Sequence, residues 1–279
     1  MIRRTALAAL FAAAAAPARA DLIDRLFAPR ASLWPFWAAD DPAATLRVDH
    51  APWSRFLAAW RVEGADGIAR IAYGRVAAAD RAALDGYVAA LAAVPVRRLA
   101  RAEQFAYWVN LYNALTVQLV LRHYPVRSIR DIDISPGLFA RGPWERKLAT
   151  IEGQPVSLND IEHRILRPIW RDPRVHYALN CASLGCPDIG RAALPADGTD
   201  AWLDGAARAY VNHPRGVSAG PDGLTVSSIY EWFRADFGGS ERAVIEHVRR
   251  YAAPALARRL AGVPAIARTA YDWSLNDAR

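Results

Sequence analysis

The sequence predicts an α+β fold, a helix-rich single domain around a small, mostly antiparallel sheet. Apolar residues recur at helical spacing in several segments, and shorter segments alternate apolar and polar residues as strands do. These segments follow one another without a repeated strand–helix–strand order, which argues against a doubly wound sheet. The 279 residues are 53% hydrophobic, enough to bury one large core. We expect the domain to span residues 40–275, with residues 21–39 as an N-terminal arm packed on it.

The first half of the chain is expected to form three helices and one strand. Aromatic side chains line one side of a short helix over residues 52–61, and an alternating run over 67–76 reads as a strand. An alanine-rich helix follows over 77–94. The clearest helix covers 101–124, where large apolar residues recur along one stripe at spacings of three and four. Pro125 ends this pattern.

The middle of the chain combines a hairpin, a helix, a strand and a loop. Two short alternating runs around a Glu-Gly pair predict a hairpin within residues 148–156. Ser157 is the expected N-cap of a helix over 157–167, with an acidic residue three positions later that completes a capping box. Alternation over 174–180 predicts a strand, which leads into a tight loop with both cysteines over 181–187.

The last third of the chain again mixes helices and strands. Helical spacing predicts helices over 199–211, 240–251 and 254–260. A Pro-Asp-Gly turn predicts a hairpin within 216–226, and weak alternation over 266–273 predicts a final strand.

Charge and motif content bear on the partners of the protein. The formal net charge is +7, but the basic residues, nearly all arginines, are scattered among acidic ones. Nucleic-acid-binding proteins usually carry a basic stripe and a recognisable motif, so we predict no nucleic-acid partner. The chain has no P-loop and no dinucleotide-binding glycine fingerprint. We therefore expect no cofactor, and a small molecule or peptide as the ligand.

The N-terminus has the features of a secretory signal peptide over residues 1–20. Arg3 and Arg4 form a charged start, an apolar stretch follows over 6–16, and Ala-Arg-Ala stands at 18–20, where signal peptidase would cut. The apolar stretch is too short to span a bilayer, and no later segment is apolar for long enough to do so. We therefore expect a periplasmic or secreted protein without a membrane span after cleavage.

Three blocks of the chain resemble a known family. They are residues 105–116 (FAYWVNLYNALT), 157–167 (SLNDIEHRILR) and 174–187 (RVHYALNCASLGCP). In this order they resemble the family catalogued as domain of unknown function 547, which has members among secreted bacterial proteins and plant proteins. The core of the resemblance covers about residues 95–205. It implies a domain and not a reaction.

One hypothesis makes the protein a cysteine-dependent hydrolase or acyl transferase on peptide, amide or ester substrates. Thiol catalysis needs a thiolate, a base to generate it and a group that orients the base. Cys181 would be the nucleophile, exposed where the predicted strand enters a turn. His163 would be the base, and Asn113 would orient its ring or donate a hydrogen bond to the oxyanion.

The alternative hypothesis is a non-catalytic binding module of the cell envelope. In an oxidising compartment Cys181 and Cys186 would form a disulfide, which closes a very small loop and stabilises the fold by about 2 kcal/mol. Their spacing is not the C-x-x-C of thioredoxin-like redox centres. A third alternative is that both cysteines are free and inert thiols. Residues alone leave these alternatives open, and with them the question of whether the protein is an enzyme.

Three further polar residues in the resembling blocks are candidate binding residues, namely Asn110, Arg174 and His176. Asn110 and Asn113 lie three positions apart on an otherwise apolar helix, so their amides are also expected to bridge buried backbone groups. The histidines and cysteines lack the spacing of metal ligands, and we predict no metal site.

Overall fold

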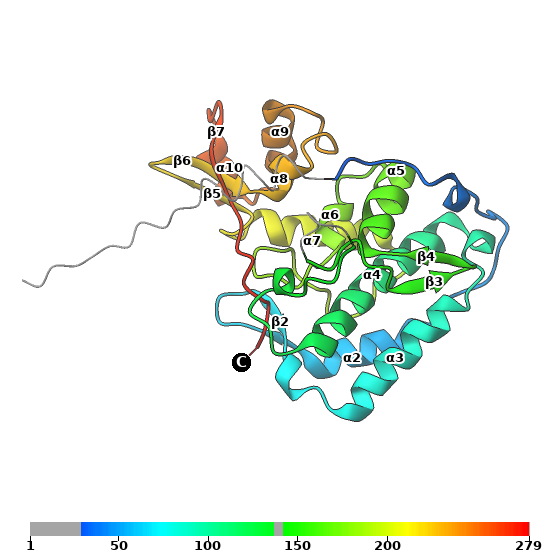
Figure 1. Cartoon of the computed structure of the whole chain (residues 1–279). Helices are drawn as coiled ribbons and strands as arrows, with labels where there is room; N and C mark the ends of the chain where they lie inside the picture. Colours follow the sequence, from blue (N-terminus) through cyan, green and yellow to red (C-terminus); the bar gives the residue numbers. More distant parts are fainter. Residues whose placement is uncertain (1–28, 137–141, 279) are drawn as a thin grey trace, which may run out of the picture.

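The structure is a computed structural model that describes residues 29–136 and 142–278 (Figure 1). The expected signal peptide and the first part of the expected arm lie outside the described residues. The rest of the arm contains one 3-10 turn, η1 (Pro35–Trp37). Trp37 is almost fully buried, and its ring meets that of Trp108 edge-on at 4.9 Å. This part of the arm therefore packs on the core.

Helix α4 (Arg101–His123) lies at the centre of the fold (Figure 1). Every residue from Glu103 to Leu121 is buried, polar ones included. The helix is where its spacing predicts it, but it is buried all round and not along one stripe. The reason is that α3 (Ala78–Ala92) packs along it and the π-helical segment η5 (Asp160–Leu166) contacts it as well.

The other helical segments are short, and most lie where spacing predicts them. Helix α8 and the 3-10 turns are not among the predicted elements, because segments this short carry no periodicity. One of these turns, over residues 73–75, lies in the segment 67–76 that was predicted as a strand, of which only residues 69–71 are extended. The α-helices are α2 (Ala51–Trp60), α5 (Arg167–Trp170), α6 (Val175–Ala178), α7 (Thr199–Val211), α8 (Ile229–Trp232), α9 (Glu241–Tyr251) and α10 (Pro254–Leu260). The remaining 3-10 turns are η2 (Tyr73–Arg75), η3 (Val96–Arg98) and η4 (Ile129–Asp131).

The α+β prediction is confirmed, but the described strands form three small sheets in place of one. Two are antiparallel pairs, and the third has the order β5-β6-β7 with β6 and β7 parallel. Both predicted hairpins are present. The strands are β1 (Arg61–Glu63), β2 (Ala69–Ile71), β3 (Ala149–Ile151), β4 (Gln154–Val156), β5 (Val217–Gly220), β6 (Gly223–Ser227) and β7 (Ile266–Ala270).

The predicted strand over 174–180 is wrong, because this segment contains the helical turn α6. The backbone N–H of Val175 donates to the carbonyl of Asp172, and the N–H of Tyr177 to that of Arg174, both at about 3 Å. His176 is as deeply buried as its apolar neighbours. The alternation of polar and apolar residues therefore does not mark two faces of a sheet.

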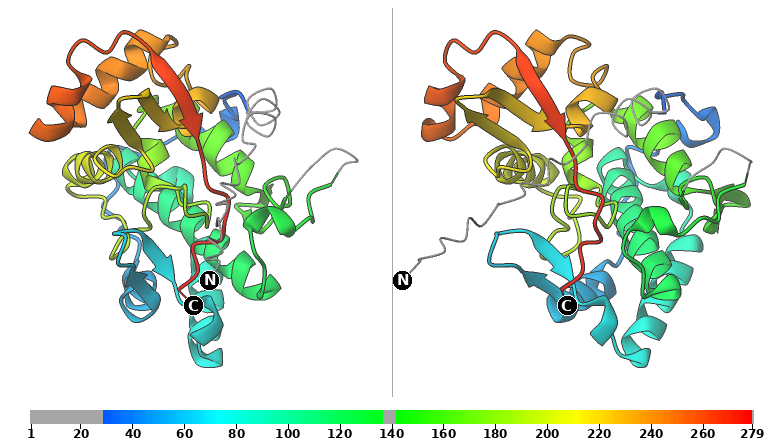
Figure 2. Two further views of the ribbon diagram at one scale, coloured as in Figure 1. Left: turned by 90° about the vertical axis from the view of Figure 1, so that its left-hand side faces the viewer. Right: turned by 60° about the vertical axis from the view of Figure 1, so that its left-hand side comes forward.

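The segment after β7 joins the two ends of the molecule. It runs from the three-stranded sheet back to β2 and is drawn in red in Figure 2. On the way it pairs with the cysteine loop. The N–H of Leu184 donates to Ser274 and the N–H of Gly185 to Asp272, each at 2.8 Å, and Asn276 donates back to Ala182. Residues 90 positions apart thereby lie side by side.

Candidate functional site

A buried amide holds the chain in place just before Cys181. The side chain of Asn113 on α4 donates to the carbonyl of Ala178 at 2.9 Å and accepts from the N–H of Asn180 at 2.8 Å. The side chain of Asn180 in turn accepts from the N–H of Ala182, which has a left-handed φ of 59°. The strained turn therefore carries Cys181 at its start and is fixed to the central helix.

The sulfur of Cys181 is surrounded by three polar hydrogen-bonding groups. Its Sγ lies 2.9 Å from the hydroxyl of Tyr271, 3.3 Å from that of Ser183 and 3.0 Å from the Sγ of Cys186. The two hydroxyls are themselves 2.8 Å apart. Cys181 is partly exposed, whereas Cys186 is buried. A reagent in solvent would therefore meet Cys181 first.

The pKa values of the two thiols are shifted in opposite directions. Burial raises the pKa of Cys181, but hydrogen bonds from Cys186, Ser183 and Tyr271 to its sulfur outweigh burial and leave the pKa below its ordinary value. Burial raises the pKa of Cys186 well above its ordinary value, and the neighbouring sulfur of Cys181 adds to this. Cys181 is therefore the group that ionises. Both cysteines are free thiols in this structure.

A second polar cluster, which we call the Arg167 cluster, lies under Phe233. Its members are Glu162, His163, Arg167, His176 and Asp236, all buried or half-buried. Arg167 donates to Asp236 at 2.6 Å and to Nδ1 of His163 at 2.9 Å. Nε2 of His176 lies 2.7 Å from Asp236. The ring of Phe233 stacks on His176 with ring centroids 4.3 Å apart, and the guanidinium of Arg167 lies over the same ring at 4.7 Å from its centroid.

The π-helical turns of η5 place two members of this cluster side by side. Ser157 and Asp160 form the expected reciprocal cap, because the N–H of each donates to the side chain of the other. Beyond this cap, Glu162 accepts a hydrogen bond from Tyr112 at 3.2 Å, and His163 follows it directly. Segments of π-helix are rare and often occur at functional sites.

The Arg167 cluster is charged at neutral pH. Burial alone would raise the pKa of Glu162, but His163, His176 and Arg167 lower it to about 2. Burial would also raise the pKa of Asp236, but His176 and Arg167 outweigh this effect and lower the pKa to about 2. Burial lowers the pKa of His163 to about 4 although Glu162 opposes it, so its imidazole is neutral at pH 7.

The structure brings the predicted catalytic residues into two separate networks. Cys181 interacts with Tyr271 and Ser183, whereas the ring of His163 accepts from Arg167. Within the described part of the chain, no hydrogen bond joins Cys181 to His163. Asn113 reaches the backbone beside Cys181 and not the His163 ring.

The three predicted binding residues are also engaged within the protein. Asn110 exchanges two hydrogen bonds of 2.9 Å with the backbone of Leu194. Both amides on α4 thus bridge buried backbone, as expected. His176 belongs to the Arg167 cluster. Arg174 lies elsewhere, where it binds three aspartates around a surface cavity, Asp172, Asp200 and Asp204.

Sequence reasoning missed Tyr271, which contacts the sulfur of Cys181. It also missed Asp236, one of the two acids of the Arg167 cluster. Tyr271 lies at the end of the predicted last strand, 90 residues after Cys181, and nothing local marks it. Asp236 follows a short helix and is equally unmarked. Only the closure of the fold brings these residues to the site. Ser183 was visible beside the cysteine, but no motif gave it a role.

Comparison with known proteins supports the resemblance seen in the sequence. Residues 96–211 match the family described as "Protein of unknown function, DUF547". No curated protein and no solved structure matches the chain. The matched stretch includes Asn113, His163 and Cys181 and ends before Asp236 and Tyr271.

No helix within residues 29–136 and 142–278 has the length and apolar character needed to cross a membrane. In the same ranges, no group of three or more His, Cys, Asp or Glu side chains is arranged to hold a metal ion.

Proposed function

We propose that the protein is a cysteine-dependent hydrolase or acyl transferase with Cys181 as its nucleophile. The observation that supports this is the pair of hydroxyls, from Tyr271 and Ser183, within 3.3 Å of a partly exposed sulfur. Hydroxyl groups that donate to a sulfur favour its thiolate, the reactive form. The substrate class is a peptide, an amide or an ester.

The proposed reaction forms and breaks one thioester. The Cys181 thiolate attacks the carbonyl carbon, and the resulting tetrahedral intermediate expels the alcohol or amine, which takes a proton from the Tyr271 hydroxyl. Water or another acceptor then attacks the thioester, releases the acyl product and returns a proton to Tyr271. Asn113 is a positioning residue, because its amide fixes the backbone next to Cys181.

The assignment of His163 as the base stays a prediction. Its imidazole is neutral at pH 7, as a base requires, but it is bonded to Arg167. The two hydroxyls at the sulfur offer a route to the thiolate that needs no contact with the imidazole. A comparison of variants, described in the Discussion, distinguishes these two origins of the thiolate.

The experiment is acylation by p-nitrophenyl acetate under reducing conditions. We expect a burst of p-nitrophenolate and an acetyl group on Cys181, located by peptide mapping, followed by slow turnover. Cys181→Ala should abolish both, whereas Cys186→Ala keeps the nucleophile and should still be acetylated. Acetylation no faster than that of a free thiol, or equal labelling of both cysteines, would contradict the proposal.

The second candidate function is a binding module closed by a disulfide between Cys181 and Cys186. Their sulfurs are 3.0 Å apart, and half-buried aromatic rings adjoin the loop. Tyr271 and Trp232 have ring centroids 4.8 Å apart, and Trp273 lies 4.7 Å from Tyr271. Such rings are common in ligand sites. Alkylation of both cysteines only after reduction, judged by intact mass, would favour this candidate.

We also propose that the protein is exported and acts in the periplasm or outside the cell. The charged, apolar and small-residue segments of residues 1–20 support this. Expression of the full chain in a bacterium, with N-terminal sequencing of the periplasmic protein, is the test. The expected mature chain begins at Asp21, and full-length protein in the cytoplasm would contradict the proposal.

A further inference from the structure

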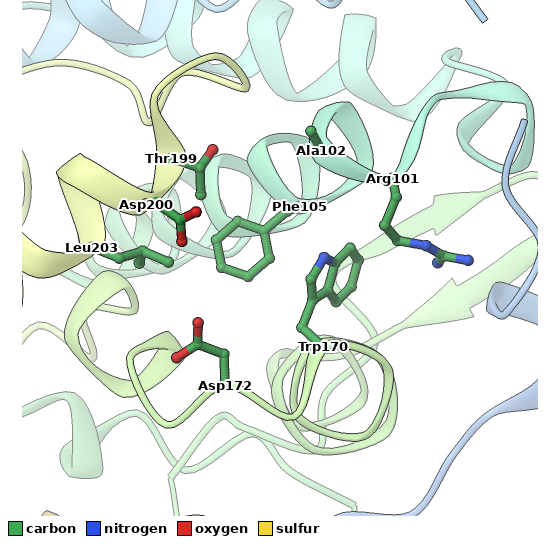
Figure 3. A pocket seen from close by; sticks show the side chains of 8 residues that line it. All are labelled: Arg101, Ala102, Phe105, Trp170, Asp172, Thr199, Asp200 and Leu203. Atoms are coloured by element: carbon green, nitrogen blue, oxygen red, sulfur yellow. The ribbon is translucent and has the colours of Figure 1, made fainter. Parts of the chain in front are cut away.

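We propose that a cavity between α4, α5 and α7 binds a guanidinium or ammonium group carried on a short apolar stem (Figure 3). The cavity has a volume of about 270 Å³ and opens to solvent. It is lined by the start of α4, the end of α5 and the start of α7. Cys181 and the Arg167 cluster do not line it, so this inference is independent of the proposed function.

The floor of the cavity is apolar and preformed. Phe105 and Leu203 are each 2% exposed and form its base. The ring of Trp170 meets that of Phe105 edge-on at 5.2 Å, which leaves the indole as a wall (Figure 3). Since these side chains are fixed by the core, an apolar stem can pack on them without ordering the site first.

The part of the cavity away from Arg101 carries an excess of negative charge (Figure 3). Asp172 and Asp200 line the cavity there, and both bind the guanidinium of Arg174, at 2.6 and 2.7 Å. Asp204 binds the same guanidinium at 2.9 Å. Three carboxylates therefore share the guanidinium of Arg174, and the charge of Arg208 also acts on Asp204 and helps to lower its pKa. The group of three aspartates and two arginines keeps an excess of one negative charge.

The arginine that lines the cavity does not offset this excess. Arg101 binds Asp40 and also donates to Gln104 and to the carbonyl of Ala38. In Figure 3 its guanidinium points away from the ring of Phe105. Asp40 thus already balances the charge of Arg101. This pair lies at the end of the cavity away from Asp172 and Asp200.

These features select one class of ligand. An anion would be repelled by Asp172 and Asp200, and a neutral apolar group would leave their charge without a partner. Lysine and arginine stems pack on apolar surfaces while their charged ends stay near solvent. Trp170 also offers its ring to a cation, as the Arg101 guanidinium 5.6 Å from the ring centroid illustrates. A basic amino-acid side chain, free or in a peptide, fits these requirements.

The test is calorimetric titration of the full mature chain at low ionic strength with N-acetyl-arginine methylamide. The matched control ligand is the citrulline analogue, which has nearly the same shape but no charge. We expect the arginine compound to bind at least about tenfold more tightly and its affinity to fall with salt. A capped Ala-Arg-Ala peptide distinguishes the sources, because tighter binding of the peptide indicates a peptide ligand and equal binding indicates a free amine or guanidine.

Two matched variants locate the site. Asp200 and Asp197 both have side chains that are 91% exposed, so substitution of either leaves the fold intact, but only Asp200 lines the cavity. Asp200→Asn should weaken arginine binding about fivefold, and Asp197→Asn should leave it unchanged. Equal affinity for the arginine and citrulline compounds, or equal effects of the two variants, would overturn the proposal.

Discussion

The hydroxyl of Tyr271 is one of three groups that hydrogen-bond the sulfur of Cys181, beside Cys186 and Ser183. Tyr271 lies 2.9 Å from the sulfur, and its hydrogen bond favours the thiolate. We predict that Tyr271→Phe raises the pKa of Cys181 by about one unit, because a hydrogen bond to a charged group contributes roughly 1.5 kcal/mol. The rate of iodoacetamide labelling against pH, measured at Cys181 by mass spectrometry, gives this pKa.

Two further variants distinguish whether the hydroxyls at the sulfur or the His163 imidazole favours the thiolate of Cys181. Tyr251→Phe removes a hydroxyl that bonds Asp204 and not the sulfur, so it should leave the labelling profile unchanged. His163→Gln should also leave the labelling profile unchanged if hydrogen bonds from the two hydroxyls are what stabilises the thiolate. A profile that shifts in His163→Gln and not in Tyr271→Phe would establish His163 as the base and contradict our assignment of Tyr271.

At the residue scale, the sequence indicated part of the candidate site. Cys181 and Asn113 stand in blocks with clear signals, and the prediction that Asn113 bridges backbone is confirmed. Tyr271 and Asp236 were beyond reach, because long-range closure and not local pattern brings them to their partners. Local spacing says nothing about such contacts, whereas a loop or a cap is specified by residues a few positions apart.

At the scale of one element, α4 supports two loops through similar amides. Asn113 holds the backbone beside Cys181, and Asn110 holds Leu194. We predict that Asn113→Ala and Asn110→Ala each lower the free energy of unfolding by about 2–4 kcal/mol, because each leaves two buried backbone groups unpaired. Only Asn113→Ala should alter the labelling rate of Cys181. Equal effects on labelling would mean that Asn113 does not position the cysteine.

The Arg167 cluster depends on one cation shared by elements far apart in the sequence. Arg167 on α5 is buried and bonds Asp236 and His163. We predict that Arg167→Met lowers the free energy of unfolding by about 3–5 kcal/mol, since it removes the cation that bonds half-buried Asp236 and lowers the pKa of buried Glu162. Urea unfolding measures the effect. Arg242→Gln, at an exposed ion pair, should leave the midpoint unchanged, and a similar loss in both variants would contradict this account.

Element boundaries show where sequence patterns succeed and fail. The hairpin within 148–156 was predicted from its turn residues and helix α9 from helical spacing, both of which are local signals. The structure adds a side-chain cap by Ser240 at the start of α9. The segment 174–180 was misassigned because His176 is buried with its Nε2 2.7 Å from Asp236, a long-range contact that alternation cannot reveal. The number of sheets was also out of reach, because it depends on which strands pair over long distances in the chain, as β7 does with β6.

For the whole molecule, buried ionisable groups link stability to pH. Burial lowers the pKa values of His50, His163 and His247 to about 4 in the folded protein. The unfolded chain takes up these protons near pH 6.5, and the folded chain only near pH 4. Folding is therefore progressively less favourable as the pH falls through this window. Below about pH 4.5, the lowered pKa values of Glu162 and Asp236 extend the loss towards pH 2.

We predict that the free energy of unfolding, measured in urea, decreases steadily from pH 6.5 to pH 4. Each histidine contributes up to about 1.4 kcal/mol per pH unit, and His163 alone about 3 kcal/mol over the window. His163→Gln should lower the free energy of unfolding at pH 7, and it should reduce the slope of this free energy against pH by the contribution of about one proton. His123→Gln, at an exposed histidine, should reproduce the wild-type slope. A stability that stays constant over this range would show that the buried histidines gain their protons in the folded protein as easily as in the unfolded chain.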